Sequence, residues 1–230
     1  MTGGGVAERL RQVEARIEAA CARAGRPGGS VRLLPVTKTF PAASVLQAVE
    51  AGYRRFGENR VQELVAKAGQ LAAVAGLEWE VIGHLQTNKA KAAAAVSVAV
   101  QSLDSLKLAV ALDHACAALD KTLDVLVEVN SSGEPSKFGL PPDAVPAFAR
   151  ALRACARLRP LGLMTLALPS ADPERVAECF RVMRRAQARL QDQDGGGWTE
   201  LSMGMSGDYE LAVEHGSTCV RVGTAIFGQR

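Results

Sequence analysis

The chain has 230 residues, of which 48% are hydrophobic and 22% are charged, and its formal net charge is +3. This length fits either two small domains or one large α/β barrel, and a chain of this size needs no disulfide or metal to stabilise its core. The longest apolar run, residues 92–100, is far shorter than the roughly 20 residues that span a bilayer. Residues 1–6 lack the basic start and apolar stretch of a secretory signal. We therefore expect neither a membrane anchor nor a secretory signal.

Charges of both signs alternate along predicted helices such as residues 174–189, and no basic block indicates a nucleic-acid partner. The cysteines are scattered, odd in number and without a C-x-x-C pair: Cys21, Cys116, Cys155, Cys179 and Cys219. This usage is typical of reduced thiols in a cytoplasmic protein, most of them packed in the core. We predict a cytoplasmic protein that binds neither nucleic acid nor membrane.

Helical and β-rich segments alternate along the chain. An amphipathic helix is predicted at residues 6–24 and ends at the glycine-rich residues 25–29. Eight β-rich runs follow, with helical segments between them: residues 31–36, 53–57, 79–83, 96–101, 124–130, 160–165, 199–203 and 218–223. Each unit then has about 29 residues, close to the length of a βαβ unit. We predict an α/β fold in which residues 1–230 form one domain, a (β/α)8 TIM barrel with an extra N-terminal helix.

The carboxyl ends of barrel strands form the functional face of such a fold. Lys38 follows the first strand, where Val36 and Phe40 would desolvate its amine, lower its pKa and make it a nucleophile. A solvated loop lysine is the alternative. Asn59 follows the second strand and either presents a neutral hydrogen-bonding group to the barrel mouth or caps the next helix. His84 follows the third strand without partners at metal-ligand spacing, so no zinc site is expected.

The last two strands end in segments typical of phosphate binding. Ser206 follows the seventh strand, and Gly223 and Thr224 follow the eighth, each before a predicted helix start. Barrels hold phosphate groups at these two loops through free backbone N–H groups, although ordinary turns have the same composition. Arg221 shares the inward face of its strand with Gly223, and a buried cation needs a partner such as a neighbouring carboxylate. A nucleophilic lysine beside a phosphate site indicates a phosphorylated carbonyl compound bound as a Schiff base, either pyridoxal phosphate or an aldol substrate.

Seven blocks in the same order resemble the pyridoxal phosphate homeostasis protein family: LPVTKTFP (34–41), FGENRVQE (56–63), IGHLQTNK (82–89), SKFG (136–139), LGLM (161–164), LSMGMS (201–206) and RVGTAIFG (221–228). The similarity extends from about residue 6 to the end of the chain, and the family's barrel is similar to the N-terminal domain of alanine racemase. The resemblance implies roles for six residues in binding pyridoxal 5'-phosphate: Lys38 forms the Schiff base, Ser206, Gly223 and Thr224 hold the phosphate, Asn59 lies beside the ring, and Arg221 approaches the pyridine nitrogen. It assigns no role to Lys137 or His84.

The resemblance also bears on catalysis. Alanine racemase uses a second domain to close the site and supply a catalytic tyrosine, whereas this chain ends seven residues after Gly223, and Tyr53 and Tyr209 offer no obvious substitute. An open mouth does not exclude water from a reactive carbanion. We therefore expect a non-catalytic monomer of vitamin B6 homeostasis that buffers the cofactor or delivers it to apo-enzymes. The alternatives are a pyridoxal phosphate-dependent racemase or decarboxylase acting on an amino acid, and a Schiff-base aldolase.

Overall fold

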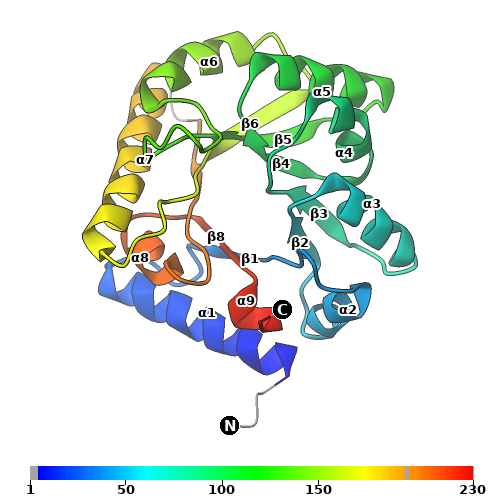
Figure 1. The fold of residues 1–230 in the computed structure, drawn as a ribbon, viewed down its shortest axis with the longest axis vertical. Coiled ribbons are helices and arrows are strands. Elements are labelled where there is room, and N and C mark those ends of the chain that lie inside the picture. Colours follow the sequence, from blue (N-terminus) through cyan, green and yellow to red (C-terminus); the bar gives the residue numbers. More distant parts are fainter. Residues whose placement is uncertain (1–4, 195–196, 230) are drawn as a thin grey trace.

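In the computed structural model, which describes residues 5–194 and 197–229, eight parallel strands form one sheet that curls into a barrel (Figure 1). Their bounds are β1 Arg32–Pro35, β2 Arg55–Glu58, β3 Glu78–Val81, β4 Ala99–Leu103, β5 Leu123–Glu128, β6 Leu158–Met164, β7 Glu200–Ser202 and β8 Cys219–Val222. The sheet order β1-β8-β7-β6-β5-β4-β3-β2 leaves β1 and β2 at its two ends. A parallel bridge between Val36 and Gly57 joins these ends, so the barrel is nearly closed. The predicted (β/α)8 TIM barrel is confirmed.

Helices surround the barrel as a ring (Figure 1). They are α1 Val6–Arg23, α2 Ala42–Glu50, α3 Val61–Gln70, α4 Ala90–Val96, α5 Leu106–Ala118, α6 Val145–Leu152, α7 Pro173–Asp194, α8 Tyr209–Glu214 and α9 Thr224–Phe227, with 3-10 turns η1 Thr87–Lys89 and η2 Pro142–Ala144. None of the helices in the described part of the chain has the length and apolar character needed to cross a membrane. The predicted N-terminal helix is present as α1, and it ends one residue before the predicted end.

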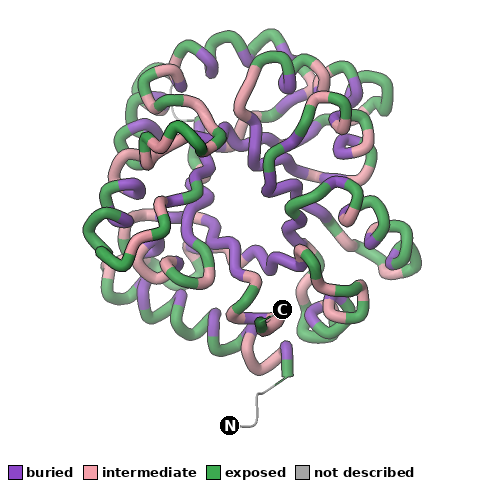
Figure 2. Tube along the Cα trace, in the orientation of Figure 1, coloured by how far each residue is buried: buried purple, intermediate pink, exposed green. Residues whose placement is uncertain are grey.

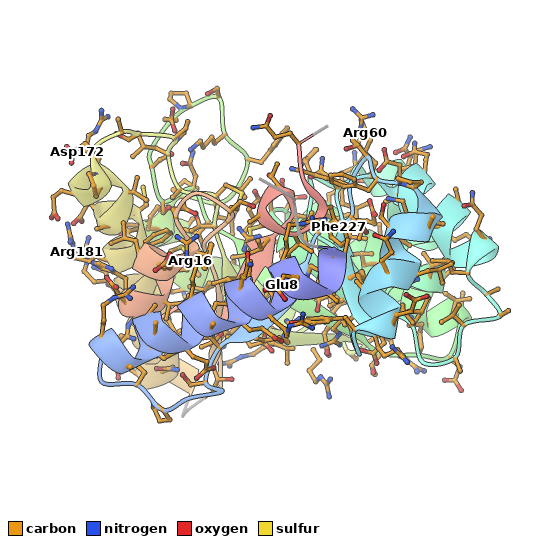
Figure 3. The ribbon with its side chains drawn as sticks, turned by 90° about the horizontal axis from the view of Figure 1, so that it is seen from below. Glu8, Arg16, Arg60, Asp172, Arg181 and Phe227 are labelled. Atoms are coloured by element: carbon orange, nitrogen blue, oxygen red, sulfur yellow. The ribbon has the colours of Figure 1, made fainter. Side chains whose placement is uncertain are left out.

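Helix α1 packs across the outside of the barrel at α8 and α9, and Figure 3 shows it with Glu8 and Arg16 along its length and Phe227 of α9 nearby. The predicted apolar face is buried: Val6, Leu10, Val13 and Ile17. Arg23 Nε donates to Glu214 Oε1 at 2.7 Å, which adds a polar contact between α1 and α8. Helix α1 thus holds the C-terminal βα units, which carry the phosphate-type loops.

Element boundaries differ from the prediction where helix propensity exceeds β propensity. The fourth strand was expected from residue 96, but it begins at Ala99, because the alanine-rich residues 90–96 form α4. The helix after β2 begins at Val61 and has Arg60, not Asn59, at its N-cap position. The carboxyl ends of the strands, which face the barrel mouth, lie within two residues of the predicted ends.

The barrel interior carries an unusual number of polar side chains, and Figure 2 shows the strands as a ring of buried residues. Ser202 of β7 donates to Gln101 Oε1 of β4 at 2.6 Å. Since β4 and β7 are not neighbours in the sheet, this hydrogen bond crosses the interior. Gln101 Nε2 donates in turn to Glu80, whose Oε1 accepts from Arg32 at 2.6 Å. A chain of hydrogen bonds therefore crosses the interior of the barrel.

Candidate functional site

A pocket of about 310 Å³ opens at the carboxyl ends of the strands. Its lining contains all six residues predicted from the sequence, together with five neighbours: Val36, Lys38, Asn59, Ile82, Leu166, Met205, Ser206, Gly207, Arg221, Gly223 and Thr224. Residues from the first and last strands meet here because β1 pairs with β8, with Pro35 opposite Val222. The structure thus brings the six predicted residues into one cavity.

Lys38 lies in the turn that follows β1, and its side chain is half-buried at the edge of the pocket. Asn59 is exposed and lines the same pocket from the end of β2. The alternative role of Asn59 as a helix cap is not observed, because Arg60 occupies the N-cap position of α3 and makes no side-chain cap bond. Gly83 permits this placement, since a Cβ at residue 83 would overlap Asn59 Oδ1 and the Asn59 carbonyl. Lys38 and Asn59 therefore border the cavity from neighbouring strand ends.

The loops after β7 and β8 meet at one oxygen atom. Ser206 Oγ accepts hydrogen bonds from the backbone N–H groups of Gly223 and Ala225 at 3.3 and 3.4 Å. Converging backbone N–H groups form the kind of concavity that binds an anionic oxygen. Thr224 adds a second hydroxyl to the pocket lining. The residues present therefore fit a phosphate group.

Arg221 is 3% exposed and points into the barrel below this pocket. Its Nη1 donates to Ser202 Oγ at 2.5 Å, and its Nη2 donates to the Thr165 carbonyl at 2.7 Å. Burial lowers the pKa of the guanidinium, while nearby Cys219, Asp208 and Glu128 act in the opposite direction. No salt bridge joins Arg221 to a carboxylate of the described residues, so the alternative of a direct ion pair with a neighbouring carboxylate is not observed. A hydroxyl and a carbonyl fix the guanidinium instead.

A chain of hydrogen bonds also connects Arg221 to the buried carboxylate of Glu80, which pairs with Arg32 and Arg55. Ser202 accepts from Arg221 and donates to Gln101, and Gln101 donates to Glu80. Every link has the same donor-to-acceptor direction, from the cation to the carboxylate, which polarises the chain and strengthens each bond. Sequence reasoning missed Ser202 and Gln101, although polar residues at inward positions of β-rich runs were a usable signal.

Glu128, at the end of β5, is a second buried group that the sequence did not indicate. Its side chain is 5% exposed, and its Oε2 has no hydrogen-bond partner among the described residues. Burial raises the pKa of this carboxyl to about 7, the charge of Asp104 adds to the rise, and Arg221 opposes it. Glu128 is therefore partly protonated near neutral pH.

Glu128→Gln is expected to make the fold more stable at alkaline pH. The raised pKa means that the folded chain keeps a proton that the unfolded chain releases, so the contribution of Glu128 is complete below pH 4.5 and is lost as the pH rises through 7. The full rise in the pKa of Glu128 corresponds to about 3 kcal/mol in the free energy of unfolding. Urea unfolding at pH 5 and pH 8.5 should show the variant gaining about 2 kcal/mol relative to wild type over this range. A pH-independent difference would contradict the assignment.

Two further side chains of the sequence analysis lie at the barrel mouth but outside the pocket lining. His84 Nδ1 is 3.2 Å from Asp104 Oδ2, and its ring stacks on Phe138 with centroids 3.7 Å apart. Lys137 Nζ donates to the Ala167 carbonyl at 3.1 Å and pairs with Glu134 at 2.7 Å. Within residues 5–194 and 197–229, no cluster of three His, Cys, Asp or Glu side chains could hold a metal ion. His84 and Lys137 thus have partners of their own beside the pocket.

Comparison with known proteins relates this geometry to a family. The family model for the alanine racemase N-terminal domain matches residues 9–230. The chain is 44% identical to the pyridoxal phosphate homeostasis protein of Pseudomonas aeruginosa, over 98% of this chain and 96% of that protein. It is 41% identical to the protein of the same name from Escherichia coli, over 98% and 97%. The structure of PipY from Synechococcus elongatus with PLP bound has a TM-score of 0.86 and 37% identity, covering 97% of this chain and 100% of that one.

Proposed function

The chain belongs to the alanine racemase N-terminal domain family and to the pyridoxal phosphate homeostasis proteins, and from this premise we propose that it binds pyridoxal 5'-phosphate and buffers or delivers it without catalysis. The observation that carries the proposal is the single pocket that contains all six residues expected to bind the cofactor. The bound cofactor supplies a reactive aldehyde and an aromatic ring that can accept electrons.

Each side of the pocket matches one part of this ligand. Lys38 supplies the amine that attaches covalently to the aldehyde as a Schiff base. Ser206, Gly223 and Thr224 hold the phosphate, which the converging N–H groups at this end of the pocket favour. Asn59 lies beside the ring. Arg221 faces the pyridine nitrogen, and a fixed cation there disfavours protonation of that nitrogen, so the ring accepts electrons less readily.

The polar groups of the pocket support binding without turnover. Lys38 and Arg221 are the titratable side chains in its described lining. A racemase needs a second acid or base on the face of the cofactor opposite the lysine. The two tyrosines do not provide one, because Tyr53 donates to Glu14 of α1 and Tyr209 is buried behind the Ser206 loop, outside this lining. A racemase or decarboxylase is therefore the less favoured function.

Two wider aspects of the function belong to the same proposal. All five cysteines are free and buried, which supports a location in the reducing cytoplasm. We further propose that the protein acts as a monomer and that its partners are apo-enzymes that use the cofactor. The mouth of the pocket is where such an enzyme would receive it.

The function is tested by loading the purified protein with pyridoxal 5'-phosphate. We expect visible absorption from the bound cofactor, and borohydride reduction followed by peptide mapping should place the modification on Lys38. Mixing the loaded protein with an apo-enzyme should transfer the cofactor and restore that enzyme's activity. Rapid exchange of an amino acid's α-proton with solvent, measured by NMR in D₂O, would contradict the non-catalytic role and favour a racemase.

A further inference from the structure

The turn that carries Lys38 is bound by side chains of the next βα unit, a contact that the cofactor residues themselves do not explain. Lys67 of α3 donates from Nζ to the Thr37 carbonyl at 2.6 Å. The Thr37 hydroxyl donates to Glu58 Oε1 at 2.6 Å, and Lys67 Nζ lies 2.5 Å from the same oxygen. On the other side of Lys38, the Thr39 N–H donates to Glu63 Oε2 at 3.0 Å. Both residues that flank Lys38 are therefore fixed by α3 and the end of β2.

The groups of this arrangement are buried. Thr37 and Glu58 are 0% exposed, and Lys67 is 6% exposed. Burial raises the pKa of Glu58, although its hydrogen bonds to Lys67 and Thr37 oppose the rise. A buried ion pair of this kind often stabilises a protein no better than apolar residues of the same size. Its presence directly beneath Lys38 therefore calls for a reason other than stability.

The backbone beside Lys38 is also strained. Thr39 has φ of +66°, in the left-handed region that is unfavourable for a β-branched residue. The Glu63 carboxylate that accepts from the Thr39 N–H also lies 3.8 Å from Lys67 Nζ. Lys67 thus holds the carbonyl before Lys38, Glu63 holds the N–H after it, and Glu58 holds Lys67 and the Thr37 hydroxyl. Strained backbone at such a point is typical of functional sites.

We propose that Lys67, together with Glu58 and Glu63, is a positioning group for Lys38. By fixing the backbone on both sides of Lys38, these side chains direct its amine into the pocket, opposite Ser206 and Gly223. A ligand whose phosphate is held at one end can reach the amine only if the amine is at a defined distance and angle. This inference rests on the proposed function, because it assigns the contacts to the covalent attachment of the cofactor.

Lys121 provides a control for the lysine-to-carbonyl contact, because it makes such contacts at another place in the fold, without a carboxylate partner. Its Nζ donates to the Ala94 and Ser97 carbonyls, both at 2.8 Å, and the side chain is half-buried. These contacts tie the turn between α5 and β5 to the end of α4, and neither accepting residue lines the cofactor pocket. Lys121→Met therefore removes a comparable lysine-to-carbonyl contact without touching the Lys38 turn.

The test compares Lys67→Met with Lys121→Met in the loaded protein. We measure the rate of cofactor release to an excess of apo-enzyme, the fraction of Lys38 modified by borohydride, and the melting temperature. Lys67→Met should release the cofactor at least about tenfold faster and lower the modified fraction. Lys121→Met should lower the melting temperature while release and modification stay at wild-type values.

Thr37→Val serves as a milder second variant, since it removes only the hydroxyl contact to Glu58 and keeps the side-chain shape. It should shift release in the same direction by a smaller factor, and it decides the question if Lys67→Met does not fold. Wild-type release from both variants, or equal acceleration in Lys67→Met and Lys121→Met, would overturn the positioning role. Failure of the wild-type protein to become modified at Lys38 would instead overturn the proposed function.

Discussion

Lys38→Ala is expected to abolish covalent retention of pyridoxal 5'-phosphate while leaving the protein folded. Among the described residues that line the pocket, Lys38 is the lysine. Its side chain is half-buried and is not part of the apolar core. Without it the cofactor can bind only through its phosphate and ring. After desalting, the variant should show no visible cofactor absorption and no borohydride-dependent mass increase, whereas the wild-type chain should show both.

Two control variants distinguish the loss of the nucleophilic amine from the loss of a positive charge. Lys38→Arg keeps a cation in the pocket but cannot form the covalent bond, so it should lose retention as Lys38→Ala does. Lys89→Ala removes a lysine of η1 that is outside the pocket lining, and it should retain the cofactor like the wild-type protein. A borohydride adduct of wild-type yield on another lysine of Lys38→Ala would show that Lys38 is not the attachment point.

Much of the fold could be predicted because each βα unit carries its own signals. Alternating β-rich and helical segments of even length are local, and eight of them leave few ways to close a sheet. The boundaries were less accurate where a local preference competes with the sheet, as in residues 90–96, where alanines extend a helix to the expected start of a strand. The strands that precede Lys38, Asn59 and Gly223 end within one residue of the prediction, so the predicted residues still met in one pocket.

The side chains that support the site could not be predicted in the same way. The Gln101 and Ser202 side chains bond across 101 positions of sequence, and nothing local identifies such a pair. For Arg221, the sequence indicated only that a buried cation needs a partner, and the barrel supplies the Ser202 hydroxyl and the Thr165 carbonyl. Lys67 resembles any lysine on an amphipathic helix until α3 is packed against the turn after β1. Residues that contact the ligand were thus visible as motifs, whereas their supports depend on tertiary packing.

The phosphate end of the pocket should account for much of the affinity, and combining Ser206→Ala with Thr224→Val tests this. Each hydrogen bond to a charged group contributes about 1.5 to 3 kcal/mol, so losing two hydroxyl contacts should weaken cofactor binding at least about 100-fold. Titration by absorbance at fixed ionic strength would measure the loss. Ser206→Ala alone should have an intermediate effect, since the N–H groups of Gly223 and Ala225 that now meet Ser206 Oγ stay in place for the phosphate.

Pyridoxal, which lacks the phosphate, makes this test specific to the phosphate site. The wild-type protein should bind pyridoxal 5'-phosphate much more tightly than pyridoxal, and the double variant should lose most of that preference while its affinity for pyridoxal stays the same. The reason is that both ligands present the same ring to Asn59, and the cyclic hemiacetal that lowers the free aldehyde of pyridoxal affects the wild-type protein and the variant equally. A change in the preference between the two ligands therefore reports the loops after β7 and β8. If the double variant lost affinity for both ligands by the same factor, the two hydroxyls would act on Lys38 or on the fold. The loops would then be ordinary turns.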